Sequence, residues 1–523
     1  MSRHAAVVAA GILLSRIAGL VRDRFFAHYF GDSDAADVFR AAFRIPNLLQ
    51  NLFGEGVLSA SFIPVYAGLL ARKQEDEAAR VASAIFCLLS LVLSCLVLAG
   101  ILATPLMIQV IAPGFKGAKL ELCVTLVRIL FPGAGILVIS AWCLGILNSH
   151  RRFFASYTAP VAWNLVMIAS LCVFGARMGQ FPLTRVLAWG SVIGSVVQVG
   201  VQVPQLLPLI HGFRLLLGLA MDSVRTIIRN FMPMLVSRGV VQVSAYVDTM
   251  IASFLPTGCL AALVYAQTLY VLPVSLFGMS VSAAELPALS SALGDVDEKA
   301  AYLRKRLDAG LRQIAFFVVP SAVGFLSLGD VIAGTIYQTG RFTHGDSVYV
   351  WAILAGSAIG LLATTLGRLY ASAHYALQDT RTPLRYAIAR VVVTGLLGYF
   401  CALPLPPLLG IEARFGVVGL TASAGLAGWL EFALLRRSLN ARIGTTGVPG
   451  AFLTRLWIAA AAAAGAAWCV KVAIGQGWPL LLGLCCLGTY GLAYFALAAA
   501  MGVPEVRGLF ERIAGWRGQR RKA

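Results

Sequence analysis

The segment over residues 36–70 is long and apolar enough to cross a membrane as one helix, yet it carries charged and amide side chains. With about 100° between successive residues, these polar positions fall within an arc of about 80°, so one helix face is polar from end to end. A charge at the centre of a bilayer costs about 2.5 kcal/mol or more. This face must therefore meet water or charged partners inside the protein. The polar positions are Asp37, Arg40, Arg44, Asn47, Asn51 and Glu55.

Composition places most of the chain in lipid. Hydrophobic residues make up 59% of the 523 positions and charged residues 12%, whereas soluble domains contain about 25% charged residues. Apolar windows of about 20 residues recur along the chain about fourteen times. We therefore expect an all-α, polytopic membrane protein with about fourteen transmembrane helices. The cysteines and histidines show no metal-binding or disulfide spacing, so no catalytic metal is expected.

The basic residues predict the orientation of the helices. With both termini in the cytoplasm, about 26 basic loop residues lie inside and about 6 outside, as the positive-inside rule requires. The net charge of +19 then follows from topology and from a basic tail that anionic lipid headgroups attract. Nucleic acid is not an expected partner, and membrane lipids are. Connections between the windows are too short for a large soluble domain, which favours a transporter over an enzyme.

Two segments, GILNSHRRFFASYTAPVAWN at 145–164 and LYASAHYALQDTRTPLRYAI at 369–388, have a similar build. Each joins a helix ending in small residues to a basic turn and a proline. This internal repeat predicts two six-helix lobes in a pseudo-twofold arrangement, with a substrate site between them near the bilayer midplane. The expected divisions are an N-terminal lobe (1–212), a C-terminal lobe (213–440), two further helices (441–505) and a basic cytoplasmic tail (506–523).

Two other helices also have one polar face by helical periodicity. Where arginines converge, the natural ligand is an anion, because guanidinium groups match phosphate or diphosphate oxygens in bidentate geometry. The alternative is structural ion pairing, of Asp37 with Arg40 or Arg44 and of Asp23 with Arg22 or Arg24. The intramembrane charges Arg128 and Lys471 have no partner that the sequence identifies. The two faces consist of Ser15, Arg16, Gly19, Arg22 and Asp23, and of Arg238, Gln242, Tyr246, Thr249 and Ser253.

Several motifs together resemble the MurJ/MviN family of lipid II flippases over essentially the whole chain. The resemblance implies the fold of the multidrug/oligosaccharidyl-lipid/polysaccharide exporter superfamily and a lipid-facing groove formed by the last two helices. It implies that the protein moves an undecaprenyl-diphosphate-linked peptidoglycan precursor from the inner to the outer leaflet of the bacterial inner membrane. It also implies that Arg16, Arg22, Asp37 and Glu55 line a central cavity. The motifs are SRIAGLVRD (15–23), ADVFRAAFRIPNLLQNLFGEGVLSASFIPVY (36–66), the GILNSHRRF region and YALQDTRTP (375–383).

The chain departs from the family pattern where charged residues are expected. Asn51 replaces a basic residue, and Gln267 and Tyr270 stand where the eighth helix usually carries charges. Arg44 and Arg238 are hypothesised to supply substitute positive charge. The predicted substrate-binding residues are Arg16, Arg22, Asp37, Arg44, Asn51, Glu55, Arg238 and Gln267.

The expected mechanism is alternating access without covalent chemistry. Two energy sources are open: a sodium ion at Asp248 and Asp379, because hard cations prefer carboxylate oxygen, or the membrane potential. Lipid II is the expected cargo, and other cell-wall synthesis proteins are candidate partners. The alternatives are a flippase for another polyprenyl-linked oligosaccharide, a cation-coupled exporter of the same fold, a polyprenyl-linked glycosyltransferase and a non-transporting membrane scaffold.

Overall fold

The computed structural model describes residues 3–210, 213–290, 296–475 and 477–506. In these ranges the regular structure is helical, as the composition predicts, apart from a single bridge between Thr339 and Phe342. The described residues pack into two compact units. The first contains the chain up to Ala261 together with Thr339–Phe342, and the second contains the remainder.

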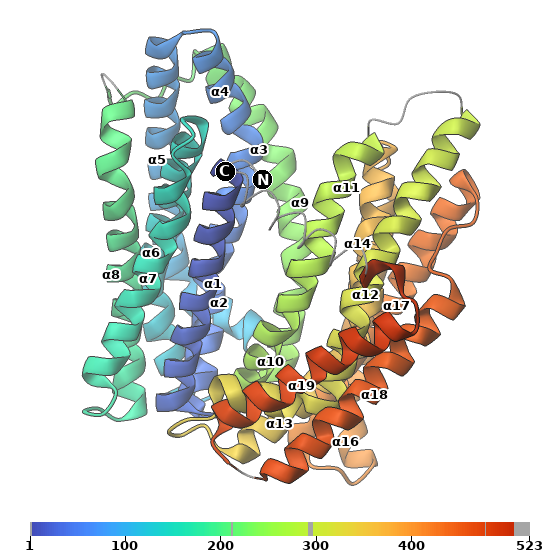
Figure 1. Ribbon diagram of the computed structural model, residues 1–523. Helices are drawn as coiled ribbons and strands as arrows, with labels where there is room; N and C mark the ends of the chain where they lie inside the picture. Colours follow the sequence, from blue (N-terminus) through green and yellow to red (C-terminus); the bar gives the residue numbers. More distant parts are fainter. Residues whose placement is uncertain (1–2, 211–212, 291–295, 476, 507–523) are drawn as a thin grey trace. The chain divides into compact units, whose positions relative to one another are not determined.

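The first unit is built around α6, which packs against α2, α5 and α8, while α7 packs against α1 and α8 (Figure 1). A 3-10 turn, Leu207–Leu209, follows α8. The helix α9 packs against α2, α3 and α5. The helices are α1 (Arg3–Phe30), α2 (Asp34–Phe53), α3 (Glu55–Ser61), α4 (Ile63–Ala71), α5 (Glu75–Ile111), α6 (Ala118–Ser149), α7 (Phe153–Phe174), α8 (Gln180–Leu206), α9 (Asp222–Ser253) and the first residues of α10 (Cys259–Pro273).

The second unit begins within α10, which passes through a π-helical turn, Val274–Met279, into α11. The helix α12 packs against α13, α14, α18 and α19, and α17 packs against α13, α14 and α15. A 3-10 turn, Ala413–Phe415, precedes α17. The helices are α11 (Ser280–Ser290), α12 (Val296–Tyr337), α13 (His344–Ala358), α14 (Leu361–Ala376), α15 (Arg381–Ala402), α16 (Leu405–Leu408), α17 (Gly416–Ile443), α18 (Gly450–Ile474) and α19 (Pro479–Ala500).

The long apolar helices are sufficient for a polytopic membrane protein. Among the described residues, eleven helices are long and apolar enough to cross a bilayer, or up to twelve if α13 and α14, which meet at a 43° bend, count as one span. The predicted number of fourteen is not reached by this criterion, which leaves out α1 and α9. The lobe boundary at residue 212 also stays a prediction.

The expected continuous helix over 36–70 is interrupted. The backbone N–H of Gly54 bonds to the carbonyl of Gln50, and its extended ψ of −153° ends α2. A second break at Phe62 separates α3 from α4, where Pro64 stands in the first turn and lacks the amide hydrogen that a continuing helix needs. The polar stripe is therefore shorter than the sequence predicts, because Glu55 begins a new helix. The side chain of Glu55 lies outside the described residues.

Candidate functional site

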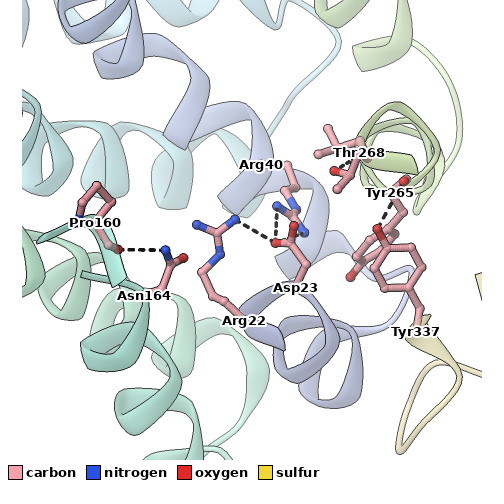
Figure 2. A network of polar contacts seen from close by, with 9 residues as sticks. Arg22, Asp23, Arg40, Pro160, Asn164, Tyr265, Thr268 and Tyr337 are labelled. Carbon is pink, nitrogen blue, oxygen red and sulfur yellow. Dashed lines mark hydrogen bonds and ion pairs between the residues drawn. The ribbon is translucent and has the colours of Figure 1, made fainter. Parts of the chain in front are cut away.

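Two arginines from neighbouring helices share one buried carboxylate. Asp23 on α1 accepts a hydrogen bond from Arg22 at 3.1 Å and from Arg40 of α2 at 3.3 Å (Figure 2). The Arg40 guanidinium also lies 4.2 Å from the centroid of the Phe26 ring, a cation–π contact. Of the predicted pairings for Asp23, the one with Arg22 forms, and Arg40 takes the place expected for Arg24.

Arg22 also faces a cavity of about 300 Å³ between α1, α2, α6, α7 and α8. Its guanidinium lies 5.0 Å from the centroid of the Trp163 ring, which orients it by a cation–π contact. Asn164 is placed beside it, with its side-chain amide donating to the carbonyl of Pro160 at 2.9 Å (Figure 2). The cavity thus has a cation, an aromatic face and amide groups. Its polar lining residues are Arg22, Gln50, Ser140, Asn164 and Gln198.

Two residues that line this cavity, Ser140 and Gln198, belong to a buried chain of polar side chains. Gln198 donates to the Ser140 hydroxyl, which donates in turn to the side-chain oxygen of Gln202, both at 2.8 Å. All three are buried, and Gln202 is fully so. These hydrogen bonds restrict the rotamers of the three side chains and join α6 to α8, although the side-chain nitrogen of Gln202 is buried without a partner among the described residues.

The polar faces predicted for α2 and α9 meet each other. Arg44 donates to the Thr249 hydroxyl at 2.6 Å, and Tyr246 donates to the Arg44 carbonyl at 3.1 Å. About two turns further along, the Asn51 amide donates to Gln242 at 3.2 Å. Asp248 also acts electrostatically on Arg44. The hypothesis that Arg44 supplies substitute charge for the cavity stays a prediction, and the side chain of Arg238 lies outside the described residues.

One alternative from the sequence paired Asp37 with Arg40 or Arg44. Among the described residues Asp37 instead bonds to backbone amides. Its side chain is 3% exposed, and its two carboxylate oxygens accept the backbone N–H groups of Gly258 and Ala261 at 2.7 and 2.8 Å. These amides lie at the N-terminal end of α10, Gly258 just before its first residue and Ala261 in its first turn, where unpaired N–H groups and the helix dipole favour a negative charge. The contacts define a structural tie from α2 to α10. The predicted substrate contact of Asp37 stays a prediction.

The remaining predicted residues are dispersed. Arg16 is exposed on α1, whereas Gln267 is half-buried on α10 in the second unit. Asp379, in the turn before α15, accepts the backbone N–H and hydroxyl of Thr382, and together with Arg442 they lower its pKa to about 2. Among the described residues no group of His, Cys, Asp or Glu side chains forms a metal-binding cluster. Sodium binding at Asp248 and Asp379 stays a prediction.

The sequence analysis did not identify several charged contacts inside the second unit. Lys471 of α18 has a partner, because it donates to Asp330 of α12 at 2.6 Å. Arg390 of α15 pairs with Glu431 of α17 at 3.0 Å. The rule applied to residues 36–70, that charges inside apolar windows need partners, would have marked all of these. Arg128 likewise has a partner, the carbonyl of Ile101 on α5 at 3.3 Å.

Similarity to known proteins agrees with the fold and with the polar interior. The family described as "Lipid II flippase MurJ" matches residues 26–484. The protein named "Lipid II flippase MurJ" from Burkholderia cenocepacia is 32% identical over 94% of this chain and 95% of its own length. A protein named "Probable lipid II flippase MurJ" from Vibrio cholerae serotype O1 is 30% identical over 95% of both chains.

Solved structures give the same fold. The structure described as "Lipid II flippase MurJ, inward closed conformation" aligns with a TM-score of 0.75 at 23% identity, covering 95% of this chain and 99% of that one. An inward-facing multidrug resistance MATE family transporter of the MOP superfamily aligns with a TM-score of 0.66 at 17% identity, covering 85% of this chain and 100% of that one.

A polytopic helical fold with an arginine, Arg22, lining a polar cavity between its helices is typical of a membrane transporter. Within that class, the family is decided by the match over residues 26–484 and by the identity to relatives over nearly their full length. The chain belongs to the MurJ family.

Proposed function

We propose that this protein is a flippase that moves lipid II, an undecaprenyl-diphosphate-linked peptidoglycan precursor, from the inner to the outer leaflet of the bacterial inner membrane. Membership of the MurJ family supports this function, as does the name that its relatives carry. No step of such transport makes or breaks a covalent bond, so the protein needs binding groups and a conformational change in place of catalytic residues.

The observation that carries the proposal is the placement of Arg22. It lines the 300 Å³ cavity, while Asp23 and Trp163 fix the position of its guanidinium. A guanidinium held in this way is ready to bind a diphosphate without losing further side-chain freedom. The amide side chains of Gln50, Asn164 and Gln198, which line the same cavity, are suitable hydrogen-bonding partners for sugar hydroxyl groups.

The transport cycle that we propose is alternating access with both termini in the cytoplasm. The headgroup enters the polar interior from the inner leaflet while the polyprenyl tail stays in lipid. The distribution of basic loop residues supports the orientation. Either sodium or the membrane potential drives the cycle. The potential is worth about 2.3 kcal/mol per charge for each 100 mV, and the cargo and the cavity are both charged.

The proposal is tested by complementation. Bacteria depleted of their own lipid II flippase receive the wild-type chain, Arg22→Ala or Arg80→Ala, with the membrane level of each protein measured. Arg80 is a matched control because it is an exposed arginine at the start of α5. We expect growth and outer-leaflet exposure of lipid II with wild type and Arg80→Ala, and loss of both with Arg22→Ala. Failure of a well-inserted wild type would assign the chain to another lipid-linked oligosaccharide or to a scaffold.

A further inference from the structure

A second group of charged residues lies within the membrane helices of the second unit. Arg368 on α14, Arg390 on α15, Glu431 on α17 and Tyr270 on α10 form what we term the Arg368 cluster. Arg390 donates to Glu431 at 3.0 Å, with the arginine side chain 33% and the carboxylate 16% exposed. Arg368 interacts electrostatically with the other three members.

The charges of the cluster do not balance. Glu431 forms its ion pair with Arg390. Among the described residues Arg368 forms no ion pair. Arg368 is exposed, and the second guanidinium next to it repels it. Two like charges that share one acid leave an excess of one positive charge, which an anion would neutralise.

The cluster lies near the middle of a helix that is long and apolar enough to cross a bilayer. Arg390 follows the first residue of the 22-residue α15 by nine positions, which at about 1.5 Å per residue places it about 14 Å along that helix. A cation that faced lipid at this depth would cost about 2.5 kcal/mol or more. The open side of Arg368 must therefore face water or a charged ligand.

Tyr270 adds a polar group to the same place. Its phenol interacts with Thr364, which lies one turn before Arg368 on α14, and with both arginines. The cluster thus presents two guanidinium groups, whose planar donors fit phosphate oxygens, next to an aromatic hydroxyl.

We propose that the Arg368 cluster binds the diphosphate of a polyprenyl-linked cargo, as an anion site built from residues of the second unit alone. This assignment rests on the proposed flippase function. Glu431 competes with the ligand for Arg390, so it limits the affinity of the site and favours release of the anion.

The test is equilibrium binding of farnesyl diphosphate, a short polyprenyl diphosphate, to purified full-length protein in phosphatidylcholine nanodiscs. All variants carry Arg22→Ala, so that the first cavity contributes little. We expect Arg368→Ala to weaken binding at least about tenfold, because charge-assisted hydrogen bonds are lost. Arg385→Ala, an exposed arginine on α15, is the matched control and is expected to bind as the parent does.

Glu431→Gln should change the affinity for farnesyl diphosphate in the opposite direction. A gain in affinity cannot be explained by misfolding. It removes the competing charge at nearly constant volume, so we expect tighter binding of farnesyl diphosphate by about threefold or more. Equal affinities for Arg368→Ala and Arg385→Ala would overturn the proposal, as would weaker binding by Glu431→Gln.

Two further arms identify the source of the anion. Inorganic diphosphate and nanodiscs containing phosphatidylglycerol are compared with farnesyl diphosphate in phosphatidylcholine. Preference for farnesyl diphosphate over both supports a lipid-linked cargo. Equal binding of inorganic diphosphate, or displacement by phosphatidylglycerol, would assign the site to a soluble anion or a membrane lipid instead. Because binding is measured without transport, these results are independent of the complementation experiment.

Discussion

Arg22 and Arg40 hold the same carboxylate but differ in what else they contact. Arg22 is 20% exposed and faces the cavity, whereas the Arg40 side chain is 12% exposed and packs on Phe26. Residue type alone does not separate the two, because both are arginines on a polar helix face. The contacts separate them into a residue available to cargo and a residue that holds α1 against α2.

These contacts predict different consequences of substitution. Arg22→Ala should reduce lipid II transport by at least about tenfold, because the charge-assisted contact to cargo is lost. It should destabilise the protein less than Arg40→Ala does, because Arg22 donates one hydrogen bond to Asp23 whereas Arg40 donates two and also packs on Phe26. Arg40→Ala should lower the unfolding free energy by about 1–3 kcal/mol, because Asp23 loses a buried partner. For both variants, transport is measured in proteoliposomes and thermal unfolding in detergent. The assignment fails if the stability loss is larger for Arg22→Ala.

Asp37 allows a second residue-scale prediction. Asp37→Ala leaves the buried N–H groups of Gly258 and Ala261 without the carboxylate, so we expect a loss of about 1–3 kcal/mol in thermal unfolding. Asp222→Ala is the control, because its side chain is 99% exposed at the start of α9. If both variants unfold at the wild-type temperature, the tie between α2 and α10 contributes nothing measurable.

At the scale of the element, the break between α2 and α3 requires glycine. A Cβ atom on Gly54 would lie 2.1 Å from the carbonyl oxygen of Gln50, so the backbone would have to shift. Gly54→Ala should therefore destabilise the protein and impair transport. Gly68→Ala in α4 is a matched control, because a Cβ there meets nothing within 4 Å and alanine favours a helix by about 1 kcal/mol. Equal stability and activity of the two variants would contradict a required break.

The ion pair between α12 and α18 gives another prediction at this scale. Lys471→Ala leaves the carboxylate of Asp330, which is 7% exposed, without its cation. Breaking a buried ion pair costs about 3–5 kcal/mol of unfolding free energy. We expect a loss near the lower end of this range, because the Lys471 side chain is 22% exposed and the pair is therefore only partly buried. In the double variant Lys471→Ala and Asp330→Ala the loss should be smaller. A double variant less stable than the single one would show that the pair is not the cause.

The sequence predicted elements better than it predicted their contacts. Apolar windows located the helices because burial in lipid requires long apolar segments. Periodicity placed Arg44 and Asn51 on the face that meets Thr249 and Gln242. It did not identify Gly258 as the partner of Asp37 or Glu431 as the partner of Arg390, because these contacts join segments far apart in the chain, and spacing along one helix carries no information on them.

For the whole molecule, the family and the fold were within reach of the sequence, since local motifs and hydropathy carry them. The candidate site could be predicted from the sequence only in part. Arg22 was predicted and lines a cavity, but Arg368 was not considered, because its helix shows no continuous polar stripe of the kind found at residues 36–70. Charge balance among α14, α15 and α17 becomes visible only when these helices are packed together.

The central claim, that the protein flips lipid II, is tested most directly with purified components. The full-length chain is reconstituted into liposomes with fluorescent lipid II, and the fraction of headgroups accessible to an added reagent is followed over time. We predict accessibility that rises with wild type and Arg80→Ala and stays at the level of empty liposomes with Arg22→Ala. A wild-type trace equal to that of empty liposomes, with and without sodium and a membrane potential, would contradict the claim.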